Sequence, residues 1–170
     1  MTAIRIRPPA PADHEWALAL NNSEVPHVSG LDVDSLADLI AMAAVAAVAE
    51  IGGAAAGVLV ALLPGAAYGS ANYRWFCERY PEFLYIDRVI VDPACRGRGV
   101  AGALYRHAVD FGRTRAPILT CEVNEAPPNP DSMRFHERLG FRPLGRQRTE
   151  GGAKSVVMLG LDLARLPDDA

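Results

Sequence analysis

The sequence has few cysteines, few aromatic residues and no excess of basic charge. Three of its 170 residues are cysteines, an odd number without CxxC spacing, which argues against a disulfide framework and against a zinc site. The net charge of −3 at pH 7 gives no overall basic field that could hold nucleic acid. We therefore expect no metal, no nucleic-acid partner and a reducing, cytoplasmic setting.

Long hydrophobic runs are also missing. The N-terminal residues contain no apolar core of the kind that a signal peptide needs. The region 39–63 is rich in alanine, valine and leucine, but Glu50 and Gly52-Gly53 divide it into pieces shorter than the roughly 20 residues of a membrane span. Half of the residues are hydrophobic and 22% are charged, which is a globular balance. We expect one domain over residues 1–170 and no membrane association.

Hydrophobic periodicity predicts strands and helices in mixed order. Alternating apolar residues and β-branched runs indicate strands, and apolar residues at helical spacing indicate helices. The predicted strands span residues 2–7, 45–50, 56–63, 83–91, 118–123, 141–147 and 154–161. Four helices are predicted, with starts near Asp13, at Asp34 or Ser35, at Val100 and ahead of Met133. The glycine pairs 52–53 and 151–152 predict two antiparallel hairpins.

A glycine-rich turn, Arg96-Gly97-Arg98-Gly99, lies between the strand 83–91 and the helix that begins at Val100. A diphosphate needs several converging N–H donors, which such a turn supplies together with the positive end of the helix dipole. The spacing matches neither GxxxxGK[ST] nor GxGxxG, so neither an NTPase nor a dinucleotide enzyme is indicated. Taken alone, the turn is equally compatible with a solvated loop.

Two ordered motifs make the sequence resemble the GNAT superfamily of N-acetyltransferases. The family signature [Q/R]-x-x-G-x-[G/A], which follows a strand ending in V-x-P, is matched by VDPACRGRGVA at residues 91–101. A second element, N-x-x-[A/S]-x-x-x-Y followed after three residues by G-F, is matched at residues 129–141. There His136 replaces the tyrosine. The sequence-specific resemblance covers about residues 84–142.

The resemblance implies an α+β fold and acetyl-CoA as the cofactor. The fold would be a mixed, mostly antiparallel sheet of about seven strands flanked by about four helices, splayed open between the strands 85–91 and 118–123 to take the pantetheine arm. Backbone N–H groups of the turn would hold the pyrophosphate, and Arg96 and Arg98 would add charge-assisted contacts. The implied cofactor-binding residues are Val89, Ile90, Val91, Arg96, Gly97, Arg98, Gly99, Val100, Ala101, Asn129 and Ser132.

Acetyl transfer to an amine needs a neutral amine and a proton for the departing thiolate. Asp87 matches the position where many family members carry a glutamate base, although it can instead pair with a neighbouring arginine. Glu122, at the end of the facing strand, is a second candidate base. His136 stands where the family places its tyrosine acid, and imidazole can donate a proton near neutral pH. A histidine in the last turn of a helix is also favoured by the helix dipole without any further role.

The acceptor site is the least determined part of the prediction. The segment 68–85 is rich in aromatic residues, and Asn72, Tyr73 and Trp75 would contact the acceptor if the segment is a lid, whereas a satellite core is the other interpretation. The predicted activity is transfer of an acetyl group to a primary amine of a small molecule or peptide by direct attack in a ternary complex, because no cysteine lies at a nucleophile position. The alternative is a catalytically weak acyl-CoA-binding or sensing module, and the histidine at position 136 supports it.

The final hairpin is a candidate homodimer surface.

Overall fold

The computed structural model describes residues 3–166, which form two compact units. The first unit combines residues 3–62 with Ile86–Phe111, and the second combines Leu63–Tyr85 with residues 112–166. None of the helices in this described part has the length and hydrophobicity needed to cross a bilayer. The expectation of one domain over residues 1–170 stays a prediction.

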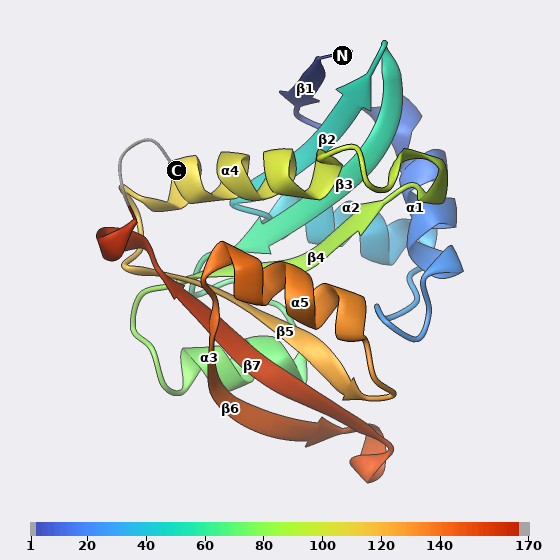
Figure 1. The fold of residues 1–170 in the computed structure, drawn as a ribbon. Coiled ribbons are helices and arrows are strands. Elements are labelled where there is room, and N and C mark those ends of the chain that lie inside the picture. The colour runs from blue at the N-terminus through green and yellow to red at the C-terminus, as the bar shows by residue number, and fades with distance from the viewer. Residues whose placement is uncertain (1–2, 167–170) are drawn as a thin grey trace. The chain divides into compact units, whose positions relative to one another are not determined.

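The first unit is built from strands β1 to β4 and three helices (Figure 1). Its elements are β1 (Ile4–Arg7), α1 (His14–Ser23), α2 (Val33–Met42), β2 (Val45–Ile51), β3 (Ala54–Leu62), most of β4 (Leu84–Val91) and most of α4 (Val100–Gly112). The first two residues of β4 and the last residue of α4 belong to the second unit. β1 pairs with β2, and β2 with β3, both antiparallel. The glycine pair 52–53 forms the predicted hairpin, because both glycines have positive φ.

Helices pack on both faces of the sheet in the first unit. Successive residues of a strand point to opposite faces, and Gly57 and Val58 of β3 illustrate this. A Cβ atom at Gly57 would lie 2.8 Å from Cγ1 of Val100, so the first turn of α4 rests directly on β3. Val58 instead forms a buried cluster with Leu20 of α1. The close approach at Gly57 fixes where α4 begins.

The second unit is built around β5 and β7 (Figure 1). Its elements are the first two residues of β4, α3 (Ala71–Cys77), β5 (Ile118–Ala126), α5 (Pro130–Leu139), β6 (Arg142–Thr149) and β7 (Lys154–Asp162). β7 pairs antiparallel with both β5 and β6. β4 pairs with β5 in parallel, with Leu84 opposite Leu119 and Tyr85 opposite Thr120.

The seven strands have the hydrogen-bonded order β1-β2-β3-β4-β5-β7-β6. The pair β4–β5 is parallel, and the pairs β1–β2, β2–β3, β5–β7 and β6–β7 are antiparallel. The predicted α+β fold, with a mixed and mostly antiparallel sheet of about seven strands, is confirmed.

Helix α3 is the element that periodicity did not predict, so the described chain has five α-helices where about four were expected. Its sequence, ANYRWFC, contains aromatic residues of modest helix propensity. Ser70 caps the helix, because its Oγ accepts from the N–H of Tyr73 at 3.3 Å. Tyr73 and Phe76 are buried at 2% and 0% exposure. Tertiary packing therefore holds α3 in place.

The residues at two of the predicted helix starts do not cap their helices. The N-cap of α2 is Asp32, whose Oδ1 accepts from the N–H of Ser35 at 2.8 Å, and not Asp34 or Ser35. Asp13 does precede α1, but its carboxylate accepts from the guanidinium of Arg7 and does not cap the helix. An arginine on a neighbouring strand offers charged donors, which form stronger hydrogen bonds than a neutral backbone N–H.

Candidate active site

The turn between β4 and α4 has a backbone shape that depends on glycine. Gly97 has φ +74° and Gly99 has φ +85°, a left-handed region that side chains disfavour. Before the turn, the Asp92 carboxylate accepts from the N–H of Ala94 at 2.9 Å and directs the chain out of β4. The local sequence thus specifies the turn.

This turn presents a run of available N–H groups. The first intrachain bond at the start of α4 runs from the N–H of Ala103 to the carbonyl of Gly99, at 3.0 Å. Within residues 3–166, the backbone N–H groups from Gly97 to Gly102 donate to no other protein group. Gly97, Arg98 and Gly99 are exposed. A helix N-terminus with free N–H groups binds anions such as phosphate.

The two arginines of the turn differ in their surroundings. One guanidinium nitrogen of Arg96 donates to Oε1 of Glu24 at 2.6 Å, and Glu24 is the C-cap residue of α1. Arg98 forms no ion pair with any described residue. Arg98 therefore has the guanidinium that is available to an incoming anion, whereas Arg96 already has a carboxylate partner.

The predicted pantetheine contacts lie on β4. The side chain of Ile90 is buried at 4% exposure and packs with Leu20 and Val58. Val89 and Val91 alternate with it and are half-buried. A cofactor contact at Ile90 is therefore limited to its backbone.

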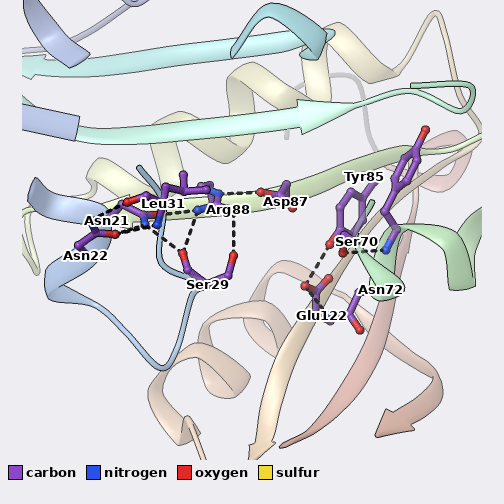
Figure 2. A network of polar contacts seen from close by, with 11 residues as sticks. Asn21, Asn22, Ser29, Leu31, Ser70, Asn72, Tyr85, Asp87, Arg88 and Glu122 are labelled. Carbon is purple, nitrogen blue, oxygen red and sulfur yellow. Dashed lines mark hydrogen bonds and ion pairs between the residues drawn. The ribbon is translucent and has the colours of Figure 1, made fainter. Parts of the chain in front are cut away.

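Asp87, the first candidate base, belongs to a buried cluster around Arg88 (Figure 2). The Nε of Arg88 donates to Oδ2 of Asp87 at 2.6 Å, and both side chains are 4% exposed. The same guanidinium donates to Oδ1 of Asn21 at 2.6 Å and to Oγ of Ser29 at 3.2 Å. These residues are called the Arg88 cluster below. They join β4 to α1 and to the loop that follows it.

Glu122, the second candidate base, is held by neutral donors on neighbouring elements (Figure 2). Its Oε1 accepts from the Tyr85 hydroxyl and from Nδ2 of Asn72, each at 3.0 Å. The Oδ1 of Asn72 in turn accepts from Nε2 of Gln147 at 2.8 Å. These four residues are called the Glu122 cluster. They come from β5, β4, α3 and β6, and all belong to the second unit.

His136, the candidate acid, is buried at 4% exposure near the end of α5. Its Nδ1 lies 2.7 Å from the carbonyl oxygen of Ser132, and because a carbonyl only accepts, Nδ1 carries the proton. Burial lowers the pKa of His136. The ring is neutral near pH 7, and its remaining nitrogen then accepts protons. Donation from that nitrogen requires the imidazolium form.

The predicted contacts Asn129 and Ser132 have local roles in α5. The Oδ1 of Asn129 accepts from the N–H of Ser132 at 3.3 Å and caps the helix. Gly140 ends it with φ +94°. Within residues 3–166, no group of three or more His, Cys, Asp or Glu side chains is arranged to hold a metal ion.

The predicted acceptor contacts Tyr73 and Trp75 lie on α3 and are both packed. The Tyr73 hydroxyl donates to the carbonyl of Leu63 at 2.7 Å, and burial raises the pKa of Tyr73. The Trp75 indole covers Gly145 of β6, where a Cβ atom would lie 2.7 Å from the ring. These contacts favour the satellite-core interpretation over the lid. The role of both residues toward an acceptor stays a prediction.

The contacts of the Glu122 cluster had no local sequence signal. Asn72 and Tyr85 bond Glu122 across 50 and 37 residues, and Gln147 bonds Asn72 across 75 residues. Such contacts depend on strand order, which single-sequence patterns do not give.

Comparison with known proteins identifies the family. The model of the acetyltransferase (GNAT) family matches residues 14–141. The chain belongs to the GNAT family of acetyltransferases. The predicted family is confirmed.

Curated GNAT relatives match a part of the chain. The peptidyl-lysine N-acetyltransferase YjaB of Salmonella typhimurium is 34% identical over 77 residues, which are 45% of this chain and 49% of that protein. YjaB of Escherichia coli is 34% identical over the same length, with 48% of its chain covered. The match thus spans about half the length of these relatives.

Solved structures share the GNAT fold across nearly the whole chain. The ribosomal-protein-S18-alanine N-acetyltransferase of Escherichia coli has a TM-score of 0.72 at 16% identity, with 99% of each chain covered. Ard1 of Thermoplasma volcanium has a TM-score of 0.76 at 17% identity, with 94% of this chain and 97% of that chain covered. YncA of Salmonella typhimurium, solved with its cofactor acetyl-CoA, has a TM-score of 0.69 at 19% identity, with 99% and 100% covered.

Proposed function

We propose that this GNAT protein transfers an acetyl group from acetyl-CoA to a primary amine. The observation that carries the proposal is the run of N–H groups from Gly97 to Gly102, unused within the described chain and set at the N-terminus of α4. These donors suit a pyrophosphate, and Arg98 adds a guanidinium to them. When bound, acetyl-CoA supplies the thioester from which the acetyl group leaves.

Glu122 is the base in this proposal. Glu122 is half-buried as a residue, its Oε2 atom is buried, and its Oε1 accepts from the neutral donors Tyr85 and Asn72. Asp87 is a weaker candidate, because its side chain is 4% exposed and bonded to Arg88. Protonating Asp87 would leave a buried guanidinium without its counter-charge, which is costly. This reverses the order in which the sequence ranks the two carboxylates.

The proton balance of the transfer needs one base and no buried acid. Glu122 accepts the proton that the amine nitrogen loses as it bonds to the acetyl carbon, and the thiol leaves with a proton from solvent. His136 in its neutral form, with Nδ1 donating to Ser132, has no second N–H to give. The geometry at His136 argues against an acid role. The acid role of His136 stays an untested prediction from the sequence.

The acceptor we propose is the side-chain amine of a lysine in a peptide. The support is the name of the curated relatives, which are peptidyl-lysine N-acetyltransferases. A lysine amine is protonated near neutral pH, so it first loses one proton to solvent, and the neutral amine then attacks and gives its second proton to Glu122.

The test compares Glu122→Gln, Asp87→Asn and the matched control Glu125→Gln, which changes an exposed carboxylate on the same strand. Thiol release is followed with acetyl-CoA and a panel of lysine peptides, free amino acids and polyamines, and CoA affinity is measured by calorimetry. Loss of a general base lowers kcat by about 100-fold or more, and we expect this for Glu122→Gln with unchanged CoA affinity. Asp87→Asn and Glu125→Gln should retain turnover.

A second function, acyl-CoA binding without efficient transfer, is favoured by the buried, carbonyl-bonded His136. The same assay separates the two functions. CoA binding without thiol release across the whole amine panel would support the binding module and overturn the transferase. An Asp87→Asn variant that loses turnover while Glu122→Gln keeps it would restore Asp87 as the base.

A further inference from the structure

The hydrogen bonds of the Glu122 cluster have a fixed direction. A carboxylate only accepts hydrogen bonds, so the amide of Asn72 must turn its Nδ2 toward Glu122, at 3.0 Å. This rotation places Oδ1 of Asn72 toward Gln147, which must then donate, and its Nε2 lies 2.8 Å away. Ionised Glu122 therefore needs Asn72 in this orientation, and a donor at position 147 sustains it.

Gln147 lies on β6, where its neighbours hold α3 at close range. Gly145, two residues earlier on the same face, is covered by the Trp75 indole, and Trp75 belongs to α3 together with Asn72. This packing keeps the Asn72 amide within reach of both β5 and β6. The side chains of Gln147 and Asn72 are each half-buried, so bulk water competes weakly for their amides.

We propose that Gln147 and Asn72 are positioning residues that keep Glu122 ionised and oriented for proton removal from the acceptor amine. This inference rests on the proposed function of Glu122 as the base. Gln147 acts through Asn72, because Gln147 donates to Asn72 and Asn72 donates to Glu122. A donor at position 147 keeps the Asn72 amide donating to Glu122. An acceptor at position 147 would turn the Asn72 amide round, so that its Oδ1 faces Glu122.

The groups that face Glu122 come from four elements. Tyr85 of β4 donates its hydroxyl to Oε1, Asn72 of α3 donates its amide, Met158 of β7 lies opposite Glu122 in the antiparallel register, and Gln147 of β6 lies behind Asn72. Tyr85 is the titratable member of this set. Tyr85→Phe accordingly belongs among the variants, so that its part in the pH profile is measured.

The experiment compares two substitutions of opposite character at position 147. Gln147→Glu offers Asn72 only an acceptor, whereas Gln147→Lys offers only donors. The pH profile of kcat/KM is recorded for the full-length protein with acetyl-CoA and the best amine of the panel. Losing hydrogen bonds to the charged form favours protonation, so Gln147→Glu should move the acid limb upward by about one pH unit, since shifts of this size follow from such bonds. Gln147→Lys should leave the limb at its original pH or below.

Control variants separate the effect of the hydrogen-bond chain from Gln147 through Asn72 to Glu122, called the relay, from the effect of added charge and from loss of folding. Thr149→Glu and Thr149→Lys place the same charges two residues along the same face of β6 and should leave the profile unshifted. Asn72→Asp, nearly isosteric, turns an acceptor toward Glu122 and should raise the limb even if Gln147→Glu fails to fold. Arg74→Ala, on the exposed side of α3, should behave as the unmodified protein.

The result distinguishes this inference from the proposed function on which it rests. The positioning role is overturned if Gln147→Glu and Gln147→Lys give equal pH profiles, or if the acid limb of Asn72→Asp stays at the original pH. In either case, a strong loss of turnover in Glu122→Gln still supports Glu122 as the base. An active Glu122→Gln variant overturns the base itself. Equal shifts from the charges at positions 147 and 149 would reduce the effect to electrostatics and also overturn the relay.

Discussion

The Arg88 cluster of the first unit and the Glu122 cluster of the second each hold a carboxylate, but with partners of different charge (Figure 2). In the first, Asp87 faces a guanidinium at 2.6 Å, and both side chains are 4% exposed. In the second, Glu122 accepts from a phenol and an amide, and as whole residues Asp87 and Glu122 are both half-buried. The Asp87 carboxylate has a charged donor at 2.6 Å, whereas the two donors to Oε1 of Glu122 are neutral.

This difference indicates what each cluster contributes. A buried ion pair with further hydrogen bonds, as Arg88 makes to Asn21 and Ser29, fixes a loop and cannot release one member cheaply. A carboxylate among neutral donors can gain and lose a proton while its neighbours stay in place. The first arrangement serves structure, and the second is suited to acid–base chemistry.

The strongest way to break this comparison is Arg88→Met. It removes the guanidinium and leaves Asp87 as an unpaired buried charge, so the free energy of unfolding should fall by about 3–5 kcal/mol. Urea unfolding followed by fluorescence measures the loss. Glu122→Gln retains an oxygen acceptor for Tyr85 and Asn72, and should cost less than about 1.5 kcal/mol, the size of one ordinary hydrogen bond.

The double variant Asp87→Asn with Arg88→Met provides the control. Because the orphaned charge is gone, it should recover a part of the lost stability. A loss below about 1 kcal/mol for Arg88→Met, typical of an exposed pair, would mean that the cluster is solvated and that Asp87 is accessible as a base after all.

The glycine-rich turn at residues 96–99 and the Glu122 cluster also differ in how far the sequence predicted them. The turn is local: the glycines, the preceding strand and the following helix are contiguous, and the positive φ values of Gly97 and Gly99 follow from residue type. Strand positions were predicted for the same reason, since period-two alternation is a local pattern.

The Glu122 cluster could not be predicted in this way. Its members come from four elements, and Gln147 and Asn72 are 75 residues apart. Helix α3 was missed because the packing of Phe76 and Tyr73, rather than propensity, stabilises it. The sequence identified Asp87 and Glu122 as carboxylates on strands, but the charge of their partners, which distinguishes them, appears only in three dimensions.

Gly99→Ala sharpens the comparison by testing cofactor binding apart from either carboxylate. A side chain at φ +85° costs about 1–2 kcal/mol, and relieving that strain would turn the N–H groups of the turn away from their common target. CoA affinity should fall about tenfold, the equivalent of 1.4 kcal/mol, in calorimetric titration. Gly69→Ala is the matched control, because its Cβ atom would meet nothing within 4 Å. Equal CoA affinities for the two variants would place the anion site elsewhere.

The smallest effect concerns Asp13, an arginine-paired carboxylate that is less enclosed than Asp87. Arg7 donates to both of its oxygens, at 2.6 and 2.9 Å, and the Arg7 side chain is 24% exposed. Hydrogen bonding to Arg7 lowers the pKa of Asp13 below that of the unfolded chain. The stabilisation is therefore complete above the unfolded value and disappears as the pH falls through the folded value.

Asp13→Asn should accordingly destabilise the protein by about 1 kcal/mol near neutral pH, the upper range for partly exposed pairs. The difference from the unmodified protein should shrink as the pH falls below the unfolded pKa of about 3.9 and through the lower folded pKa, because below that value the carboxylate is protonated in both states. Urea midpoints at several pH values measure it, with Asp34→Asn on the exposed first turn of α2 as control. A stability difference that stays constant with pH would mean that the Arg7–Asp13 charges do not contribute to stability. An arginine partner would then stabilise a carboxylate in this protein only where the pair is buried as deeply as Asp87 and Arg88.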